Sequence, residues 1–274
     1  MYSGDVSFSV ASHAQWVPGL ESQADWQRWI RHDRQAAGSG EPAVKAMPPM
    51  LRRRTSPVGK LALEAAYGAF NAASLGTAAR QVGDASDSTT DSAGLDIPVV
   101  FASRHGECAR SVELQMALAA AAPMSPTAFS LSVHNANAGL FSIARGSQAN
   151  TVAIAAGQST VEHAVIEACG LLADGMRQVL LVVADAPLPA LFSDFADEHE
   201  EPCGWSWLMQ AADENAALPT LSLQWQQVQA ASHTMPCARG TAGPAAVLRF
   251  FLDAAASTLQ RQADGRHWHW MRHA

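Results

Sequence analysis

The sequence predicts an α/β fold in which one compact domain carries helices layered on a mostly parallel sheet. Two continuous apolar runs, Ile97 to Ala102 and Val179 to Ala184, have the length and composition of strands buried on both faces. Thr151 to Ala156 predicts a further strand, followed by a tight turn and an amphipathic helix over Val161 to Gly175. Strand, turn, helix and strand in this order form a βαβ unit with parallel strands, and such a unit is typical of the α/β class.

Local signals predict the elements that precede the first buried run. Alternating β-branched and aromatic residues favour a strand over Val6 to Val10. Trp16 to Ile30 indicates a loop and then a short helix, and Gln35 to Pro42 is a loop rich in Gly, Ser and Pro. A helix is expected from Pro57 to Ala73, because Pro is favoured in the first turn and Ala and Leu follow it.

The middle of the chain alternates polar and apolar segments. Gly83 to Gly94 is a polar, low-complexity stretch and therefore a loop by composition. Glu107 to Ala121 predicts a helix that ends before two prolines. Phe129 to Val133 is a strand candidate, and Leu140 to Gly146 predicts a short helix.

The last third of the chain has weaker patterns. Leu191 to Glu201 indicates an acidic loop or broken helix, and Leu218 to Gln226 a strand. Pro244 to Leu259 predicts a helix. Arg266 to Ala274 favours a final strand at the edge of the sheet.

Composition excludes several classes of protein. The chain has 274 residues, of which 48% are hydrophobic and 16% charged, so it can bury a sizeable core. A net charge of -7 argues against nucleic-acid binding. No apolar stretch reaches the roughly 18 residues of a membrane span, and no secretory signal is expected at the N-terminus. Four scattered cysteines without a CxxC pair predict neither a metal framework nor disulfides, which favours a reducing cytoplasm.

The turn after the strand predicted over Thr151 to Ala156 is a candidate catalytic site. α/β proteins often hold a nucleophile at such a corner, where the N-terminus of the following helix stabilises developing negative charge. The turn reads Gly157-Gln158-Ser159-Thr160, and Val161 replaces the second glycine of a GxSxG pattern. Ser159 could therefore be the nucleophile of a hydrolase or could simply cap the helix, and its position favours capping.

Two cysteines are alternative nucleophiles. Cys169 lies in a helix of apolar residues, where a cysteine is usually a small core residue. Cys108 follows His105 closely, so a Cys/His pair is conceivable, but partners of this kind must meet in space and not only in sequence. The pattern favours a helix start at Cys108, with Glu107 near the positive helix end.

Two further clusters have competing interpretations. His267 and His269 alternate in the final strand and share a face, so they could bind a metal, but exposed histidines on an edge strand are favoured. The run Arg52-Arg53-Arg54 could contact an acidic carrier-protein surface. A solvated face or a source of ion pairs within the chain is the favoured interpretation of such a run.

An ordered set of segments resembles the ketosynthases of the thiolase superfamily. These proteins carry an Asn-x-x-x-Gly-x-x-Ser-Ile segment, which is present here as Asn135, Gly139, Ser142 and Ile143. A Thr-Ala-Cys-Ser-like corner follows it in the family, and the nucleophilic cysteine falls on Gln158 here. The segments around Ser125-Pro126, Ser103 to Glu107 and Val179 to Asp185 are also similar, and the similarity is good from Val6 to Pro189.

The resemblance implies a thiolase-like layered fold, α/β in class, with mainly the N-terminal half of a ketosynthase and a reduced C-terminal half. The whole chain, 1–274, would be a single ketosynthase-like domain, with 1–190 well matched and 191–274 a divergent remainder. The two histidine segments of active ketosynthases are not found. His233 lies in an unrelated context, and Gly240-Thr241-Ala242-Gly243 is only faintly similar.

The replacement of cysteine by Gln158 has a chemical consequence, because an amide cannot become a thiolate and no acyl thioester can form there. Glutamine at this corner is similar to the chain length factors of type II polyketide synthases. The resemblance is closest to the short proteins encoded with aryl polyene and xanthomonadin-type pathways. It implies a heterodimer with an active ketosynthase, transient contact with acyl carrier protein, no cofactor and no metal.

By this resemblance, Thr151 to Ala156 and Met124 to Leu140 lie near the subunit interface. Candidate residues that shape the tunnel or line the interface are Phe129, His134, Asn135, Asn137, Leu140 and Gln158. Two alternatives stay open. One is a stand-alone acyltransferase or hydrolase that uses Ser159, Cys108 or Cys169, and the other is a homodimeric scaffold that binds acyl chains without chemistry.

Overall fold

The computed structural model describes residues 3–33, 40–80, 96–213, 218–228 and 242–273. The loop expected at Gly83 to Gly94 lies outside the described residues, as do His233 and Gly240-Thr241. The described strands form one sheet in the order β3-β2-β4-β5-β1-β6-β8-β7. They are β1 (Ser3–Trp16), β2 (Val99–Ala102), β3 (Thr151–Ile154), β4 (Val179–Asp185), β5 (Cys203–Ala211), β6 (Thr220–Gln227), β7 (Thr258–Ala263) and β8 (Arg266–His273).

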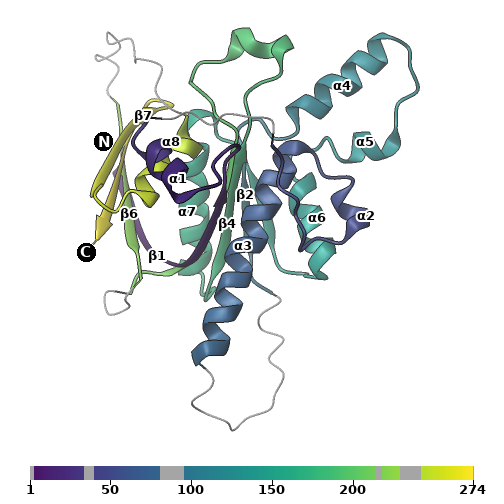
Figure 1. The fold of residues 1–274 in the computed structure, drawn as a ribbon. Coiled ribbons are helices and arrows are strands. Elements are labelled where there is room, and N and C mark those ends of the chain that lie inside the picture. Colours follow the sequence, from purple (N-terminus) through teal and green to yellow (C-terminus); the bar gives the residue numbers. More distant parts are fainter. Residues whose placement is uncertain (1–2, 34–39, 81–95, 214–217, 229–241, 274) are drawn as a thin grey trace.

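Helices cover both faces of this sheet (Figure 1). They are α1 (Gln23–Ile30), α2 (Pro49–Arg52), α3 (Pro57–Arg80), α4 (Cys108–Ala119), α5 (Pro126–Ser130), α6 (Ala136–Arg145), α7 (Thr160–Ala173) and α8 (Gly243–Leu252), with 3₁₀ segments η3 (Gly157–Ser159) and η4 (Ala190–Phe195). None of the helices in the described part of the chain is long and apolar enough to cross a membrane.

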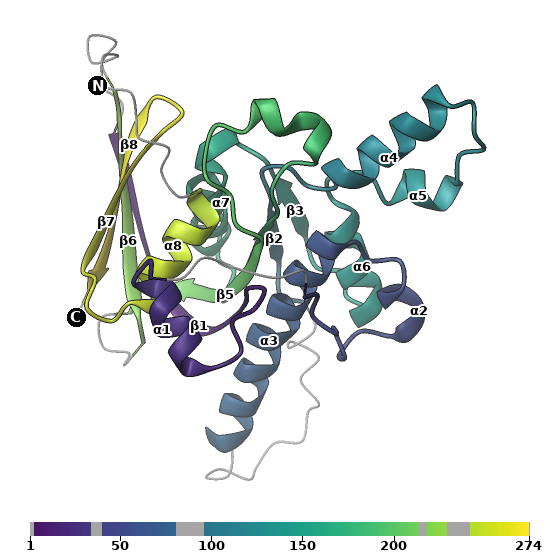
Figure 2. The same ribbon diagram turned by 45° about the horizontal axis from the view of Figure 1, so that its top comes forward.

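The sheet curls around two of these helices. α7 packs against β2 and β4, and α8 packs against β5 and β7. Figure 2 shows α1, α7 and α8 between the β6-β8-β7 end of the sheet and its β2-β4-β5 part, with α3 and α6 on the opposite side. The helix N-terminus that follows β3 is therefore enclosed by elements from both ends of the chain.

Tryptophans fill the space between the two parts of the sheet. Trp205 and Trp207 on β5 and Trp268 and Trp270 on β8 are all at most 1% exposed. The Trp207 ring lies 4.8 Å from that of Phe251 on α8, measured between centroids. Large aromatic side chains bury much apolar surface each, so a few of them link strands that are distant in sequence.

The buried runs that define the fold class form strands as predicted. β2 and β4 are buried along their whole length, and β2 pairs in parallel with both β3 and β4. The prediction of a mostly parallel sheet is wrong, because the other described ladders are antiparallel. The connection between β4 and β5, residues 186–202, contains the 3₁₀ segment η4 and no α-helix, whereas a parallel pairing usually needs a helical crossover.

Several elements differ from their predictions: α3 extends to Arg80 and not only to Ala73, and β1 is longer than the strand expected over Val6 to Val10. Residues 126–130 form α5 and not a strand, because Pro126 opens the helix and the Ser125 hydroxyl accepts a hydrogen bond from the Ala128 N–H. α8 ends at Leu252, so the helix expected to Leu259 is too long, and β7 begins at Thr258.

The final strand exists but is not at the edge of the sheet. β8 lies between β6 and β7, so the edge position predicted for Arg266 to Ala274 is wrong. The predicted alternation is confirmed, since Trp268 and Trp270 are buried while His267 is exposed and His269 half-buried. Among the described residues, no group of histidine, cysteine and acidic side chains is arranged to hold a metal ion.

Candidate functional site

The corner between β3 and α7 has a tightly specified backbone. Gly157 has a φ of 59°, in the left-handed region that favours glycine. The Thr160 hydroxyl donates to the Gly157 carbonyl oxygen at 2.7 Å and accepts from the Ala156 N–H at 3.0 Å. Thr160 therefore closes the turn from inside and starts α7 at a fixed position.

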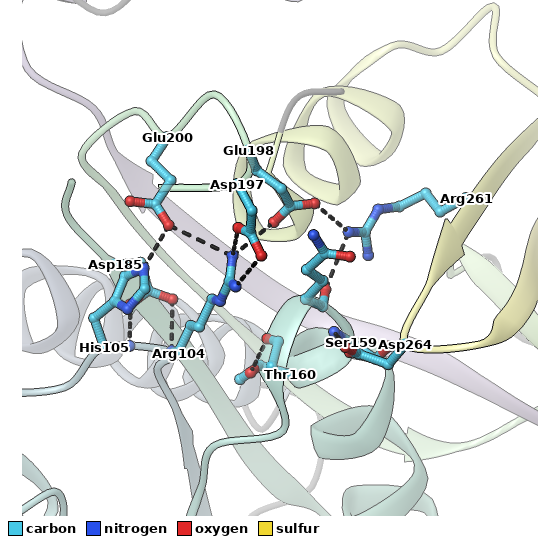
Figure 3. A network of polar contacts seen from close by, with 12 residues as sticks. Arg104, His105, Ser159, Thr160, Asp185, Asp197, Glu198, Glu200, Arg261 and Asp264 are labelled. Carbon is cyan, nitrogen blue, oxygen red and sulfur yellow. Dashed lines mark hydrogen bonds and ion pairs between the residues drawn. The ribbon is translucent and has the colours of Figure 1, made fainter. Parts of the chain in front are cut away.

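Gln158 points its half-buried side chain toward an acidic loop. The Arg104 hydrogen bond holds the pKa of the Asp197 carboxyl below its usual range, and the nearby Gln158 side chain contributes a smaller part of this shift. The Gln158 carbonyl oxygen accepts a hydrogen bond of 3.1 Å from Arg261 Nη2. The backbone of Gln158 is thus joined through Arg261 to the polar network whose labelled members Figure 3 shows.

Ser159 is not placed as a nucleophile. Its side chain is 0% exposed, and its hydroxyl oxygen accepts a hydrogen bond of 3.1 Å from Trp268 Nε1. His163 Nδ1 hydrogen-bonds the Ser159 backbone carbonyl oxygen at 2.9 Å and not the hydroxyl. The Ser159 backbone N–H donates to Asp264 Oδ2 at 2.7 Å, so the hydroxyl, the carbonyl oxygen and the N–H of Ser159 all have hydrogen-bond partners within the fold.

An ion-pair network covers the corner from the side of the 186–202 loop. Arg104 forms a bidentate pair with Asp197, with two N–O distances of 2.8 Å, and lies 3.2 Å from Glu198. His105 Nε2 pairs with Glu200. Burial raises the pKa of Glu198 to about 7, because desolvation outweighs the attraction of nearby arginines. The network therefore contains a carboxyl group that titrates near neutral pH.

Asp185, at the end of β4, holds the loop that supplies Arg104. Its carboxylate accepts hydrogen bonds from the Ser103 hydroxyl at 2.8 Å, from the Arg104 N–H at 2.8 Å and from the His105 N–H at 3.1 Å. Burial raises the pKa of Asp185, and these three donors oppose that rise. The ends of β2 and β4 are thereby tied together beside the corner.

A second buried pair lies on the other side of the corner. Arg261 on β7 pairs with Glu162 on α7, and their side chains are 7% and 0% exposed. Trp270 Nε1 donates to the same Glu162 oxygen at 3.3 Å. Arg261 also lies 3.6 Å from Glu198, so it connects the acidic loop to the first turn of α7.

A groove of about 750 Å³ opens beside this network. It runs between β7, α8 and the end of α1, and its lining includes Ile30, Phe250 and Leu259 as well as polar side chains. Gln158, Glu198, Arg261 and Asp264 belong to the same lining. The corner therefore borders open space, although its own backbone groups are engaged.

The cysteine alternatives have environments that suppress the thiolate. Burial raises the pKa of Cys169 to about 12 and also raises the pKa of Cys108. A neutral thiol is a poor nucleophile, so neither position shows an activated cysteine.

The residues predicted to shape a tunnel or an interface occupy different environments. Phe129 on α5 is 61% exposed, whereas Leu140 is only 6% exposed and packs in the core of this chain. His134 Nε2 hydrogen-bonds the Ser103 carbonyl oxygen at 2.7 Å, and Asn137 Nδ2 donates to Glu107 Oε1 at 2.8 Å. Asn135, the N-cap of α6, is exposed. Their proposed roles stay predictions.

Several residues of the polar network beside the corner were not predicted from the sequence. Asp197, Glu198 and Arg261 were not singled out, because nothing local shows which distant groups they will meet. A usable signal exists for Asp264, since Asp-Gly between two strand-like runs is a strong indicator of a two-residue hairpin.

The known proteins similar to this chain agree on one fold. The family profile described as beta-ketoacyl synthase, N-terminal domain, matches residues 26–74 and 71–271. A chain from the structure of the ketosynthase ApeO in complex with its chain length factor ApeC, from Xenorhabdus doucetiae, is similar with a TM-score of 0.72 and 22% identity, over 97% of this chain and 100% of that one.

Longer proteins share the fold over part of their length. A beta-ketoacyl synthase from Burkholderia phymatum STM815 is similar with a TM-score of 0.57 and 12% identity, over 79% of this chain and 63% of that one. The ishigamide ketosynthase/chain length factor has a TM-score of 0.55 and 14% identity, over 84% and 65%. No curated protein sequence matches significantly.

These similarities confirm the thiolase-like α/β fold that the resemblance implied. The profile match extends over most of the sequence and includes the Asn135 segment, the Gln158 corner and the strands around them. The chain therefore belongs to the beta-ketoacyl synthase family, and the profile that it matches is that of the family's N-terminal domain.

Proposed function

We propose that this chain is a non-catalytic subunit, similar to a chain length factor, that forms a heterodimer with an active ketosynthase. The observation that carries the proposal is Gln158 at the corner between β3 and α7, where the family resemblance places the acyl-accepting cysteine. A carboxamide has no thiol to donate an electron pair to an acyl group. The Gln158 side chain instead lies near Asp197 and contributes a small part of the lowering of the Asp197 pKa.

The environments of the other candidate nucleophiles support this proposal over the enzyme alternative. Ser159 is completely buried and hydrogen-bonded to Trp268, and burial raises the pKa values of Cys108 and Cys169. A nucleophile needs both access and a base within hydrogen-bond reach, and none of these three side chains has that combination in the described part of the chain.

Exposed apolar side chains support a partner surface on α4, α5 and α6. Of the ten large hydrophobic side chains that are exposed among the described residues, six lie between positions 116 and 143. They are Met116, Leu118, Met124, Phe129, Val133 and Ile143. Figure 2 shows the α4–α5 pair extending away from the body of the molecule. Large exposed apolar side chains that gather in one region are typical of protein–protein interfaces.

β3 offers a complementary contact. It is the last strand of the sheet in the described residues, and its residues are half-buried. An unpaired strand edge is a ready template for pairing with another chain. We propose that β3 and the α4–α6 surface together form the interface with the ketosynthase, in agreement with the expectation for Thr151 to Ala156 and Met124 to Leu140.

From this interface the subunit would shape the far end of the partner's acyl tunnel. The substrate would be a growing polyene or fatty-acyl chain on acyl carrier protein, in a type II polyketide system of the aryl polyene kind in the cytoplasm. Phe129 is the best placed candidate, because its ring is exposed on α5 and would meet the partner. A large side chain there would shorten the tunnel and a small one would lengthen it.

Co-expression tests the heterodimer directly. The tagged chain is produced alone and with a ketosynthase encoded near its gene, and the complex is analysed by affinity purification and size-exclusion chromatography. We expect the ketosynthase to co-purify in equal amounts. A soluble monomer that never retains a ketosynthase would contradict the heterodimer.

Intact-mass analysis tests the non-catalytic claim separately. The complex is incubated with an acyl carrier protein thioester, and the mass of each subunit is measured. We expect the acyl adduct on the ketosynthase alone. An acyl adduct on this chain would show that it has a nucleophile and would support the enzyme alternative.

A further inference from the structure

β7 is the outermost strand at one end of the sheet in the part of the chain that the structure describes, and β3 is the outermost strand at the other end. β7 pairs with β8 in an antiparallel ladder that runs from Thr258 opposite Met271 to Ala263 opposite Arg266. Among the described residues, no helix lies on the outer face of β6, β8 and β7 (Figure 2). The second edge of β7 is therefore open to another strand.

The hydrogen bonds of β7 show which of its backbone groups face this open edge. The Arg272 N–H donates to the Ser257 carbonyl oxygen at 2.8 Å, so Ser257 lies in a hydrogen-bonded pair with β8. Hydrogen-bonded and non-hydrogen-bonded pairs alternate along an antiparallel ladder. The backbone N–H and C=O groups of Thr258, Gln260 and Gln262 are therefore directed away from β8, toward the open edge. Within the described residues they have no other hydrogen-bond partner.

The groove of about 750 Å³ provides space along this edge. Its lining includes every residue from Thr258 to Gly265, together with residues of α1 and α8. Leu259 is half-buried on the face of β7 that is turned toward the helices, where Arg261 pairs with Glu162 on α7. A further strand in the groove would extend the sheet past β7 and bury Leu259 more completely.

The open edge lacks the features that usually prevent an edge strand from pairing. Natural edge strands often carry a proline, a charged side chain or a β-bulge for this purpose. From Thr258 to Ala263 there is no proline, and the register with β8 is regular. The exposed side chains of Thr258, Gln260 and Gln262 are uncharged. The charge of Arg261 is neutralised by Glu162, and the Arg261 side chain is only 7% exposed.

The strand is complementary to a second copy of itself. Two antiparallel strands exchange hydrogen bonds where outward-facing residues of both lie opposite one another. A twofold axis at Gln260 meets this condition, because it places Gln260 opposite the same residue of the second copy and Thr258 opposite Gln262. Uncharged polar side chains then lie side by side on the outer face and can exchange hydrogen bonds. On the inner face, Leu259 lies opposite Arg261.

We infer that two copies of this chain associate by antiparallel pairing of their β7 strands, with the twofold axis at Gln260, so that the two sheets become continuous. The contact is isologous and occupies both open edges, so the assembly is closed at two copies. The surface proposed for the ketosynthase lies at the β3 end of the sheet, so a complex with the ketosynthase would contain two copies of each subunit. This inference goes beyond the proposed function and does not require it.

Sedimentation velocity of the purified chain over a series of concentrations tests the association. We expect a species of twice the chain mass of 29.0 kDa. Gln260→Lys places two like charges directly opposite one another and should raise the dissociation constant of the dimer at least about fivefold. Gln260→Pro removes an N–H that faces the open edge and no hydrogen bond to β8, so it should give a folded monomer. Far-UV circular dichroism checks that both variants keep the native fold.

A charge exchange tests the position of the axis. Gln260→Glu should weaken the dimer as Gln260→Lys does, whereas an equimolar mixture of the two variants should dimerise at least as tightly as the native chain, because lysine then meets glutamate. Gln224→Lys is the matched control. Gln224 on β6 and Gln260 on β7 both lie opposite His269, but Gln224 is inside the sheet, so its substitution should leave the dissociation constant unchanged.

Several results would overturn the inference. They are a native chain that stays monomeric, a dimer that Gln260→Pro leaves intact, and a charge-exchanged mixture that does not recover the dimer. A monomeric native chain whose Gln260→Pro variant no longer retains the ketosynthase would also overturn it, since the ketosynthase would then occupy the open edge. A chain that dimerises through β7 but retains no ketosynthase would support the inference and contradict the proposed function, so the two failures are distinguishable.

Discussion

Replacement of Arg261 by methionine should destabilise the chain strongly. Arg261 neutralises Glu162, whose side chain is 0% exposed in the first turn of α7. In the variant the carboxylate keeps only the Trp270 indole N–H, at 3.3 Å, as a partner in the described residues. Glu162 Oε2 has no hydrogen-bond partner there even in the native chain. A buried charge is thus left without compensation.

The expected loss is about 3–5 kcal/mol of unfolding free energy, the usual cost of removing one partner of a buried ion pair. For chains of this size, each kcal/mol lowers Tm by about 2–4 °C, so Tm should fall by about 6–20 °C. The double variant R261M/E162Q should recover more than half of the loss, because a neutral amide is much less costly to bury than a carboxylate.

Urea unfolding and thermal melts of the purified chain measure these effects. The matched control is Arg28→Met, which removes an arginine from an exposed pair with Asp25 and should cost at most about 1 kcal/mol. If R261M loses no more stability than R28M, or if R261M/E162Q recovers nothing, Arg261 does not compensate a buried charge.

Two further predictions concern the acidic loop and the partner surface. Burial raises the pKa of Glu198 from 4.5 to about 7 in the folded chain, so stability is lost as pH rises between these values. Glu198→Gln should therefore be more stable than the native chain at pH 8, by about 1–3 kcal/mol in urea unfolding, and nearly equal to it at pH 4.5; an equal gain at both pH values would contradict this. Phe129→Ser should weaken co-purification with the ketosynthase about tenfold or more without lowering Tm. Phe195→Ser is its control, because Phe195 is 74% exposed on η4, outside the proposed interface.

The parts of the fold that were predictable are those that depend on neighbouring residues. Continuous apolar runs identify β2 and β4, and the early proline identifies the start of α3. The helix at α5 was mistaken for a strand, because a short apolar run does not distinguish the two and the Ser125 cap decides between them. Strand direction depends on the path that each connection takes, so the antiparallel half of the sheet could not be deduced from strand-like patterns.

The candidate site was predictable only in its centre. Gln158 and Ser159 follow a recognisable strand and precede a recognisable helix. Their partners do not share such a pattern: Asp197 meets Arg104 across 93 positions, and Asp264 meets Ser159 across 105. Contacts of this range depend on the three-dimensional path of the chain, and single-sequence patterns carry little information about that path.

The hairpin of β7 and β8 contacts the corner at Gln158, and Gly157 makes the strength of this contact measurable. Gly157→Ala should cost about 1–2 kcal/mol for its positive φ, and an additional amount because the new Cβ would lie 2.9 Å from Asp264 Oδ1. In an Asp264→Gly background the second contribution disappears, so the two substitutions should be non-additive by at least about 0.5 kcal/mol in a double-mutant cycle. Strict additivity of the two changes in unfolding free energy would mean that Asp264 and position 157 are not in close contact. Non-additivity of this size would mean that the contact between the hairpin and the corner requires glycine at position 157.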